Sequence, residues 1–202
     1  MSQTLHHSTT SNTPSLLLHT CCGICGAWIP EKLSQDFAVT IFYFNPNIHP
    51  REEYEKRVEA VRQMSDFLKL PMIEGEYHPP VWFDKVRGLA NEREGGARCA
   101  VCFEVRLRQT AEEAKRLSFD YFATTLTVGR FKPAAVINPI GEKIATEVGI
   151  KFLAGDFKKQ GGEMVSQKRG KELGIYHQNY CGCVYSKVAK QRIVNEITNS
   201  RN

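Results

Sequence analysis

The stretch SLLLHTCCGIC (residues 15–25) predicts a short buried strand that runs directly into a cysteine-rich turn. In a continuing strand, Cys21 and Cys22 would point to opposite faces of the sheet. Both thiols can face one centre only if the chain leaves the strand there, and Gly23 allows such a turn at little conformational cost. Because ligands of parallel α/β sheets bind beyond the carboxyl ends of the strands, this turn is a candidate functional site.

Short apolar runs alternate with amphipathic stretches along the rest of the chain. Four further strands are expected at 38–44, 71–75, 120–128 and 150–155. Helices are expected after the CCGIC segment to about residue 34, at about 51–70, after a turn within 76–89, and at about 99–117, 133–148, 165–173 and 184–197. This alternation favours a single α/β domain over 15–202, with a mostly parallel five-stranded sheet flanked by helices. We expect a Rossmann-like, nucleotide-hydrolase-like topology, a helical C-terminus, and a disordered tail over residues 1–14.

Length and composition place the chain among globular proteins. Its 202 residues suit one domain, and no apolar run approaches the roughly 20 residues of a membrane-spanning helix. The first residues contain neither a basic nor an apolar segment typical of a secretory signal, so a cytoplasmic protein is expected. In that compartment, seven cysteines indicate metal binding or redox chemistry more than a disulfide scaffold.

The charge of the chain is unevenly distributed. The whole sequence carries +5, but residues 150–202 alone hold 10 basic and 4 acidic side chains, a net +6. A basic segment of this kind suits a polyanion such as RNA, and from charge alone a solvated face without a partner fits equally well.

A second cysteine motif lies at a predicted helix start, where Cys99 and Cys102 are three residues apart and face one side of the helix. The helix dipole and Arg98 favour thiolates there, the form that binds metals. With Cys21 and Cys22 they predict a site of four thiolates. This ligand set suits both tetrahedral zinc and a 4Fe–4S cluster, and the spacing does not separate the two.

Cys181 and Cys183 form a separate pair across Gly182. A disulfide between them would close a small strained ring that is easily reduced. We therefore expect a redox-active pair that alternates between dithiol and disulfide, although two more metal ligands would also fit. For Cys25, a further ligand and a small buried side chain fit equally well.

Five motifs occur in order along nearly all of residues 15–186: LLHTCCGIC, FYFNPNIHPREEYEKR, RCAVCFEVRL, TTLTVGR and GIYHQNYCGCVYS. Together they resemble the cobalamin-independent epoxyqueuosine reductases. The resemblance implies the last step of queuosine synthesis, in which epoxyqueuosine is reduced to queuosine at the tRNA wobble position.

The resemblance also implies the cofactor and the partners. A 4Fe–4S cluster would be held by Cys21, Cys22, Cys99 and Cys102, while Cys181 and Cys183 match a pair described as redox-active. The implied partners are tRNAs with a GUN anticodon that bear epoxyqueuosine, and an unidentified electron donor, with no membrane. A second metal ion (iron) on the spare thiolates is an alternative to the dithiol as the helper in the reduction.

Loss of the epoxide oxygen requires an acid within hydrogen-bond reach. The candidates are His19, beside the first cysteines, and Tyr176 or His177, near the Cys181 pair. Substrate contacts are expected from the loop residues Asp156, Asn45, Asn47 and His49, although the last three could equally satisfy their own backbone. Phosphates of tRNA would meet Lys158, Lys168 and Arg169, and splayed bases could stack on Phe157, Tyr176, Tyr180 and Tyr185.

Two other functions compete with this interpretation. An ATP-dependent tRNA-modifying enzyme of similar fold would need a Ser/Gly-rich phosphate loop after the first strand, where this chain has HTCCGIC. A zinc-stapled RNA-binding module would use the same thiolates without any redox step.

Overall fold

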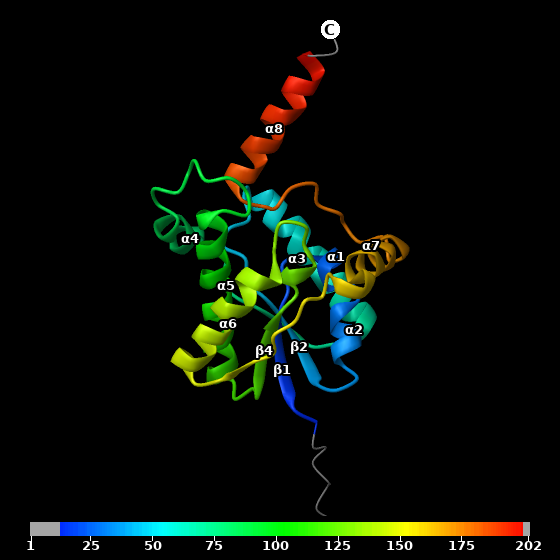
Figure 1. Ribbon diagram of the computed structural model, residues 1–202. Coiled ribbons are helices and arrows are strands. Elements are labelled where there is room, and N and C mark those ends of the chain that lie inside the picture. The colour runs from blue at the N-terminus through cyan, green and yellow to red at the C-terminus, as the bar shows by residue number, and fades with distance from the viewer. Residues whose placement is uncertain (1–12, 200–202) are drawn as a thin grey trace, which may run out of the picture.

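The computed structural model describes residues 13–199. At its centre is a sheet of five parallel strands in the order β3-β2-β1-β4-β5 (Figure 1). The strands are β1 (Ser15–His19), β2 (Ala38–Tyr43), β3 (Met72–Glu74), β4 (Tyr121–Thr124) and β5 (Lys151–Phe152). The predicted α/β class and parallel sheet are confirmed, whereas residues 1–12 of the predicted tail lie outside the described part of the chain.

Helices fill the connections between the strands and the region after them. They are α1 (Gly23–Gly26), α2 (Ile29–Leu33), α3 (Arg51–Leu68), α4 (Pro79–Lys85), α5 (Ala97–Arg116), α6 (Ala134–Val148), α7 (Gly162–Glu172) and α8 (Val184–Asn199). None of the helices within residues 13–199 is long and apolar enough to cross a membrane.

The fourth and fifth strands are shorter than the sequence predicts. β4 stops at Thr124 because its hydroxyl accepts a hydrogen bond from the backbone N–H of Leu126 at 3.1 Å, and a 3-10 turn follows over Leu126–Val128. β5 comprises only Lys151–Phe152. The predicted basic helix begins at Gly162 instead of residue 165, since a 3-10 turn (Lys159–Gly161) leads directly into it.

Both faces of the sheet are covered, which explains why the strands are nearly continuous apolar runs. Leu17, Phe42 and Phe122 pack with side chains of α5 and α6 on one face. Their neighbours in sequence point the other way: Leu18 packs near α2, and Ile41 packs against α3. The core therefore fixes the carboxyl ends of β1, β2 and β4 side by side.

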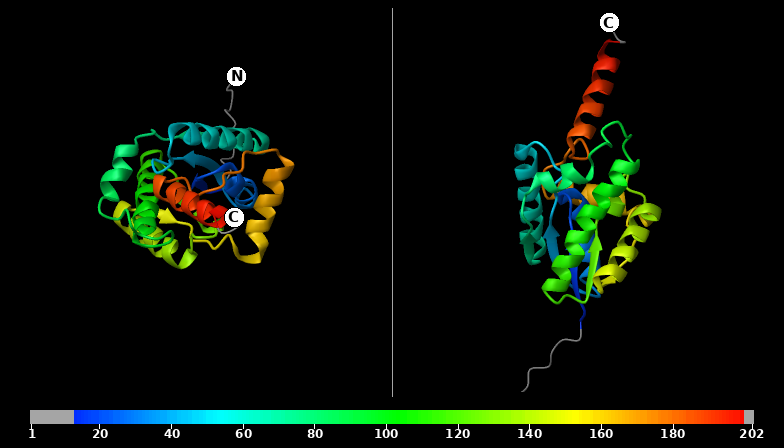
Figure 2. Two further views of the ribbon diagram at one scale, coloured as in Figure 1. Left: turned by 90° about the horizontal axis from the view of Figure 1, so that it is seen from above. Right: turned by 90° about the vertical axis from the view of Figure 1, so that its left-hand side faces the viewer.

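The loops that follow these strand ends form the functional edge of the molecule. The cysteine turn follows β1, the NPNIHP loop follows β2, and the TVGRFKP loop follows β4. The chain returns to this edge after α7, and α8 then projects away from the body (Figures 1 and 2). Segments that are far apart in the sequence thus meet around one region.

Candidate functional site

Three thiols gather directly beyond β1. The sulfur atoms of Cys21, Cys22 and Cys25 all lie within 4.8 Å of one another, and all three residues are buried. The backbone N–H of Cys25 donates to the Cys22 sulfur at 3.4 Å, so Cys22 caps the short helix α1. Cys25, which the sequence left open, thus joins Cys21 and Cys22 in one cysteine trio.

Protons are held unequally within the cysteine trio. Hydrogen bonds from Cys22 and Cys25 hold the pKa of Cys21 well below its usual range. The contact with Cys21 raises the pKa of Cys22 to about 11. The contacts with Cys21 and Cys22 raise the pKa of Cys25 well above its usual range. Cys21 is therefore the thiol that ionises first, and thiolates are the form that binds metals.

Gly23 is needed for a different reason than the sequence suggested. Its backbone does not occupy the left-handed region that favours glycine, so conformational freedom at the turn is not what it supplies. A Cβ there would lie 2.5 Å from Ile175 Cγ2 and 2.8 Å from the carbonyl oxygen of Ala60. Glycine lets the cysteine turn pack directly against α3 and the chain after α7.

The cysteines of α5 lie at the same edge of the sheet. Cys99 is half-buried in the packed cluster that contains the cysteine trio, and its sulfur accepts a hydrogen bond from the Gly95 N–H at 3.2 Å. Cys102 is buried beside Trp82 and Cys183. Among residues 13–199, only the trio brings three possible metal ligands within 4.8 Å. The predicted set of Cys21, Cys22, Cys99 and Cys102 therefore stays a prediction.

Two cations that sequence reasoning missed face these thiols. Arg106 is buried; its Nε donates to the Cys102 carbonyl at 3.0 Å, and its Nη2 has no partner among the described residues. Burial opposes its charge, but the Cys102 and Cys21 thiolates raise its pKa in sum. Burial likewise opposes the charge of Lys132, but its proximity to the Cys181 and Cys21 sulfurs raises its pKa in sum. These cations favour an anionic group among the cysteines.

Arg106 could have been found from the sequence, since Cys99, Cys102 and Arg106 are spaced three and four residues apart on one helix face. Lys132 gave a weaker signal. It lies in the loop after the fourth predicted strand, at the edge where parallel sheets bind ligands.

The Cys181 and Cys183 thiols are both free and lie in different surroundings. Cys181 is half-buried on a cavity wall, and burial raises its pKa to about 12. Cys183 is buried, and its sulfur accepts a hydrogen bond from the Ser186 N–H at 3.4 Å. Gly182 between them has φ of +124°, a conformation that side chains rarely adopt.

A buried ion pair on α3 holds this cysteine loop. Arg57 donates to Glu53 at 2.7 Å, to the Cys181 carbonyl at 2.9 Å and to the Tyr180 carbonyl at 3.0 Å. The Tyr176 hydroxyl donates to the other oxygen of Glu53 at 2.9 Å. We call these four contacts the Arg57 clamp.

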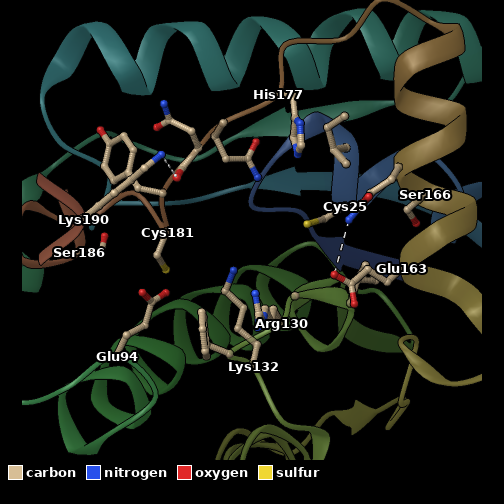
Figure 3. Close-up of a pocket in the computed structure, with 18 of the residues that line it drawn as sticks. Cys25, Glu94, Arg130, Lys132, Glu163, Ser166, His177, Cys181, Ser186 and Lys190 are labelled. Atoms are coloured by element: carbon tan, nitrogen blue, oxygen red, sulfur yellow. Dashed lines mark hydrogen bonds between the residues drawn. The ribbon is translucent and has the colours of Figure 1, made fainter. Parts of the chain in front are cut away.

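A cavity of about 590 Å³ opens beside the cysteine trio. Figure 3 shows the Cys25 and Cys181 side chains on facing walls, with the Lys132 side chain reaching into the space between them. The rim carries Glu94, Arg130, Glu163, His177 and Lys190. A volume of this size fits a ligand of about nucleoside size.

The structure places the three predicted proton donors differently. His19 is buried with both ring nitrogens engaged, by Thr124 Oγ1 at 2.9 Å and the Phe44 carbonyl at 3.2 Å, and burial lowers its pKa to about 4. The Tyr176 hydroxyl donates a hydrogen bond to Glu53, and Tyr176 does not line the cavity. His177 is exposed and lines the cavity. Of the three, His177 has the most direct access to a ligand there.

The loop residues predicted to contact the substrate lie outside the lining of the cavity. Asp156 lines a separate hollow with Trp28 and Lys159. Asn45 is buried and donates to the Thr20 carbonyl at 3.1 Å. His49 is half-buried and donates through Nδ1 to the Asn47 carbonyl at 3.0 Å. None of Asp156, Asn45, Asn47 and His49 lines the cavity, so their predicted substrate contacts stay predictions.

The predicted phosphate contacts already have protein partners. Lys158 donates to the Arg130 carbonyl at 3.1 Å, and Lys168 lies 3.9 Å from Glu172. Arg169 lies 3.3 Å from Glu31. Of the expected stacking aromatics, Tyr180 lines the cavity, whereas Phe157 lines the hollow with Asp156. Exposed ion pairs of this kind are weak, so a polyanion could displace them.

Fold and site together define a parallel α/β protein whose first strand ends in a buried cysteine trio beside a cavity. Solved structures with this fold include the U34-tRNA thiolase NcsA from Methanococcus maripaludis with its [4Fe-4S] cluster, at 11% identity and a TM-score of 0.56, covering 94% of this chain and 67% of that one. Another is a predicted subunit of tRNA methyltransferase from Methanocaldococcus jannaschii, at 10% identity and a TM-score of 0.53, covering 74% and 75%. At these identities the likeness shows the fold alone.

Comparison by sequence identifies the family. The profile of the family Epoxyqueuosine reductase QueH matches residues 16–189. An epoxyqueuosine reductase QueH of Streptococcus pyogenes is 41% identical, with 86% of this chain and 70% of the relative covered. That of Thermotoga maritima is 36% identical over 93% of this chain and 97% of the relative. The chain belongs to the QueH family of oxidoreductases, as its motifs indicated.

Proposed function

We propose that this protein reduces epoxyqueuosine to queuosine in tRNA, with a 4Fe–4S cluster held at the cysteine trio. The observation that carries the proposal is the meeting of three buried sulfurs within 4.8 Å beside an open cavity, in a chain of the QueH family. When bound, such a cluster supplies electrons one at a time.

The donor set fits this cofactor. Thiolates are the ligands of iron–sulfur clusters, and Cys21 has the low pKa that such a ligand needs. The buried Arg106 guanidinium offsets the negative charge that a thiolate-bound cluster brings into a buried place. Cys21, Cys22 and Cys25 would hold the cluster, with Cys99 and Cys102 of α5 as the source of a further ligand.

Cys181 and Cys183 are placed to assist the cluster in the reduction. Cys181 faces the cavity and Cys183 lies behind it, so the pair can act on a bound substrate as a dithiol or hold a second iron. Counting iron in the anaerobically purified protein separates these alternatives. Four irons per chain favour the dithiol, and a fifth iron that is lost in Cys183→Ser favours the second metal.

The substrate would be the wobble nucleotide of tRNAs with a GUN anticodon. Arg130 and Lys190 on the cavity rim, with the basic residues of α7, are placed to meet the flanking phosphates. Phosphate contacts release counterions, so the affinity for tRNA should fall steeply between low and moderate salt. An affinity that does not change with ionic strength would show that these residues do not contact the phosphates of tRNA.

The central test is anaerobic reconstitution with iron and sulfide, followed by mass spectrometry of epoxyqueuosine-containing tRNA after a reductant is added. We expect a brown protein that bleaches with dithionite and converts the modified base to queuosine. Cys22→Ser should lose iron, whereas Cys183→Ser should keep the cluster and stop turnover. A colourless protein with one zinc ion, or turnover of ATP, would contradict the proposal.

A further inference from the structure

Lys132 lines the cavity, and the neighbouring Gly129 makes its side-chain conformation possible. It follows β4 in the loop after the 3-10 turn, and its backbone N–H donates to the Gly129 carbonyl at 3.1 Å. A Cβ at residue 129 would lie 3.0 Å from Lys132 Cδ and 3.1 Å from Nζ. Glycine at 129 therefore leaves the space in which the lysine side chain folds back over the loop.

The Lys132 ammonium has no hydrogen-bond or ion-pair partner within residues 13–199. The other lysine on this cavity is different, because Lys190 donates to the Asn179 carbonyl at 2.8 Å. An ammonium carries three donors, and a half-buried one without a protein acceptor is free to serve a ligand.

The position of Lys132 defines which part of a ligand it can meet. Its side chain extends between the Cys25 and Cys181 side chains, which come from facing walls of the cavity (Figure 3). A reacting group must reach the same space to accept electrons at the cysteine trio or the Cys181 pair. The Lys132 ammonium thus lies in the space that the reacting group of a ligand would enter, whereas Arg130 and Lys190 lie on the rim.

Reduction of an epoxide requires a proton donor at the oxygen, in addition to a source of electrons. Both C–O bonds break, a C=C bond forms, and two electrons and two protons convert the oxygen into water. The electrons come from an external low-potential one-electron reductant. The oxygen gains negative charge as its first C–O bond breaks, so a cationic donor beside it stabilises the transition state and supplies a proton.

We propose that Lys132 is a catalytic residue whose Nζ binds the epoxide oxygen of the substrate and donates the first proton to it. The ammonium regains its proton from solvent through the open side of the cavity, and solvent supplies the second proton. This assignment rests on the proposed function. It also explains why His19 and Tyr176 are not needed as acids, since both already use their polar atoms on protein partners.

A binding experiment without reductant isolates this contact from the chemistry. Affinity is measured for tRNA with epoxyqueuosine and for tRNA with queuosine, which lacks the oxygen. We expect the wild-type protein to prefer the epoxide by about tenfold or more, as a hydrogen bond from a charged group allows. Lys132→Met should abolish that preference, Lys132→Arg should keep part of it, and the matched control Lys190→Met should not change the ratio.

Turnover and cofactor content complete the test. With dithionite as reductant, Lys132→Met should lower the turnover number by about 100-fold or more while iron and sulfide stay at the wild-type level. A wild-type preference that survives in Lys132→Met, or that is lost in His177→Gln instead, would overturn the assignment. Loss of iron in Lys132→Met alone would also overturn it, because the positive charge of Lys132 would then serve to retain the cluster. If the wild-type protein itself fails to reduce the base, the proposed function falls.

Discussion

The two cysteine segments at the cavity are held by different kinds of force. The cysteine trio after β1 is fixed by apolar close packing, with Gly23 against Ile175 and Ala60. The loop with Cys181 and Cys183 is fixed by polar contacts, chiefly the Arg57 clamp. The two groups of thiols should therefore be displaced by different kinds of substitution. Added volume should disturb the first segment, and loss of charge should disturb the second.

The largest effect is expected from Arg57→Met. It removes the guanidinium from Glu53, whose carboxylate is then buried without a cation, and it frees the Tyr180 and Cys181 carbonyls. Breaking a buried ion pair from one side costs about 3–5 kcal/mol. Urea unfolding of the apo-protein should show this loss, and alkylation of Cys181 should become faster.

A control on the same helix sharpens the comparison. Arg62 forms a 2.6 Å ion pair with Glu74, but both side chains are substantially exposed. Arg62→Met should therefore cost at most about 1 kcal/mol and leave the alkylation of Cys181 unchanged. Equal losses in the two variants would show that the Arg57 clamp does not hold the loop.

Gly23→Ala should have the next largest effect, and it acts on the other segment. The added methyl group meets the Ala60 carbonyl, which is backbone and cannot move away as a side chain can. Overpacking of this kind costs about 1–3 kcal/mol, and the shifted cysteine trio should retain less iron after reconstitution.

Gly174→Ala is the matched control for that change. Gly174 has φ of +63°, and a Cβ there meets nothing within 4 Å. It should lose about 1 kcal/mol from backbone strain alone while its iron content stays at the wild-type level. Iron loss in Gly174→Ala but not in Gly23→Ala would contradict the packing argument.

The fold could be predicted from the sequence because each main strand is a short apolar run that is recognisable by itself. Leu16, Leu17 and Leu18 are buried on two faces, and such apolar runs can be recognised without any tertiary information. Strand ends were less predictable, because the bond that stops β4 at Thr124 is a side-chain contact with the next turn.

The site was predictable in its residue types and less so in its geometry. Cysteine spacing identified the three groups, but the place of Cys25 beside Cys21 and Cys22 depends on how α1 starts. The Arg57 clamp joins residues 124 positions apart, and no local pattern reports such a contact. The same is true of Lys132, whose role depends on the walls around it.

The smallest effect is expected from replacing His49. This change tests whether the loop with Cys181 and Cys183 responds to pH. Its backbone N–H donates to the Gly182 carbonyl at 2.8 Å, and its carbonyl accepts the Tyr180 hydroxyl at 2.6 Å. Burial lowers the pKa of its ring below the usual 6.5, so the unfolded chain takes up this proton first. Stability from His49 is therefore complete above that usual value and is lost as the pH falls through the lower, folded pKa.

His49→Gln keeps the backbone contacts and removes the titrating ring. Urea midpoints measured from pH 7.5 to pH 5 should fall less steeply in His49→Gln than in the wild-type protein, and the difference in slope isolates this residue. We expect the difference to be smaller than either glycine effect, because the ring is only half-buried. Parallel pH profiles would mean that the loop with Cys181 and Cys183 is held independently of the protonation of His49. In this respect the loop would then resemble the cysteine trio after β1.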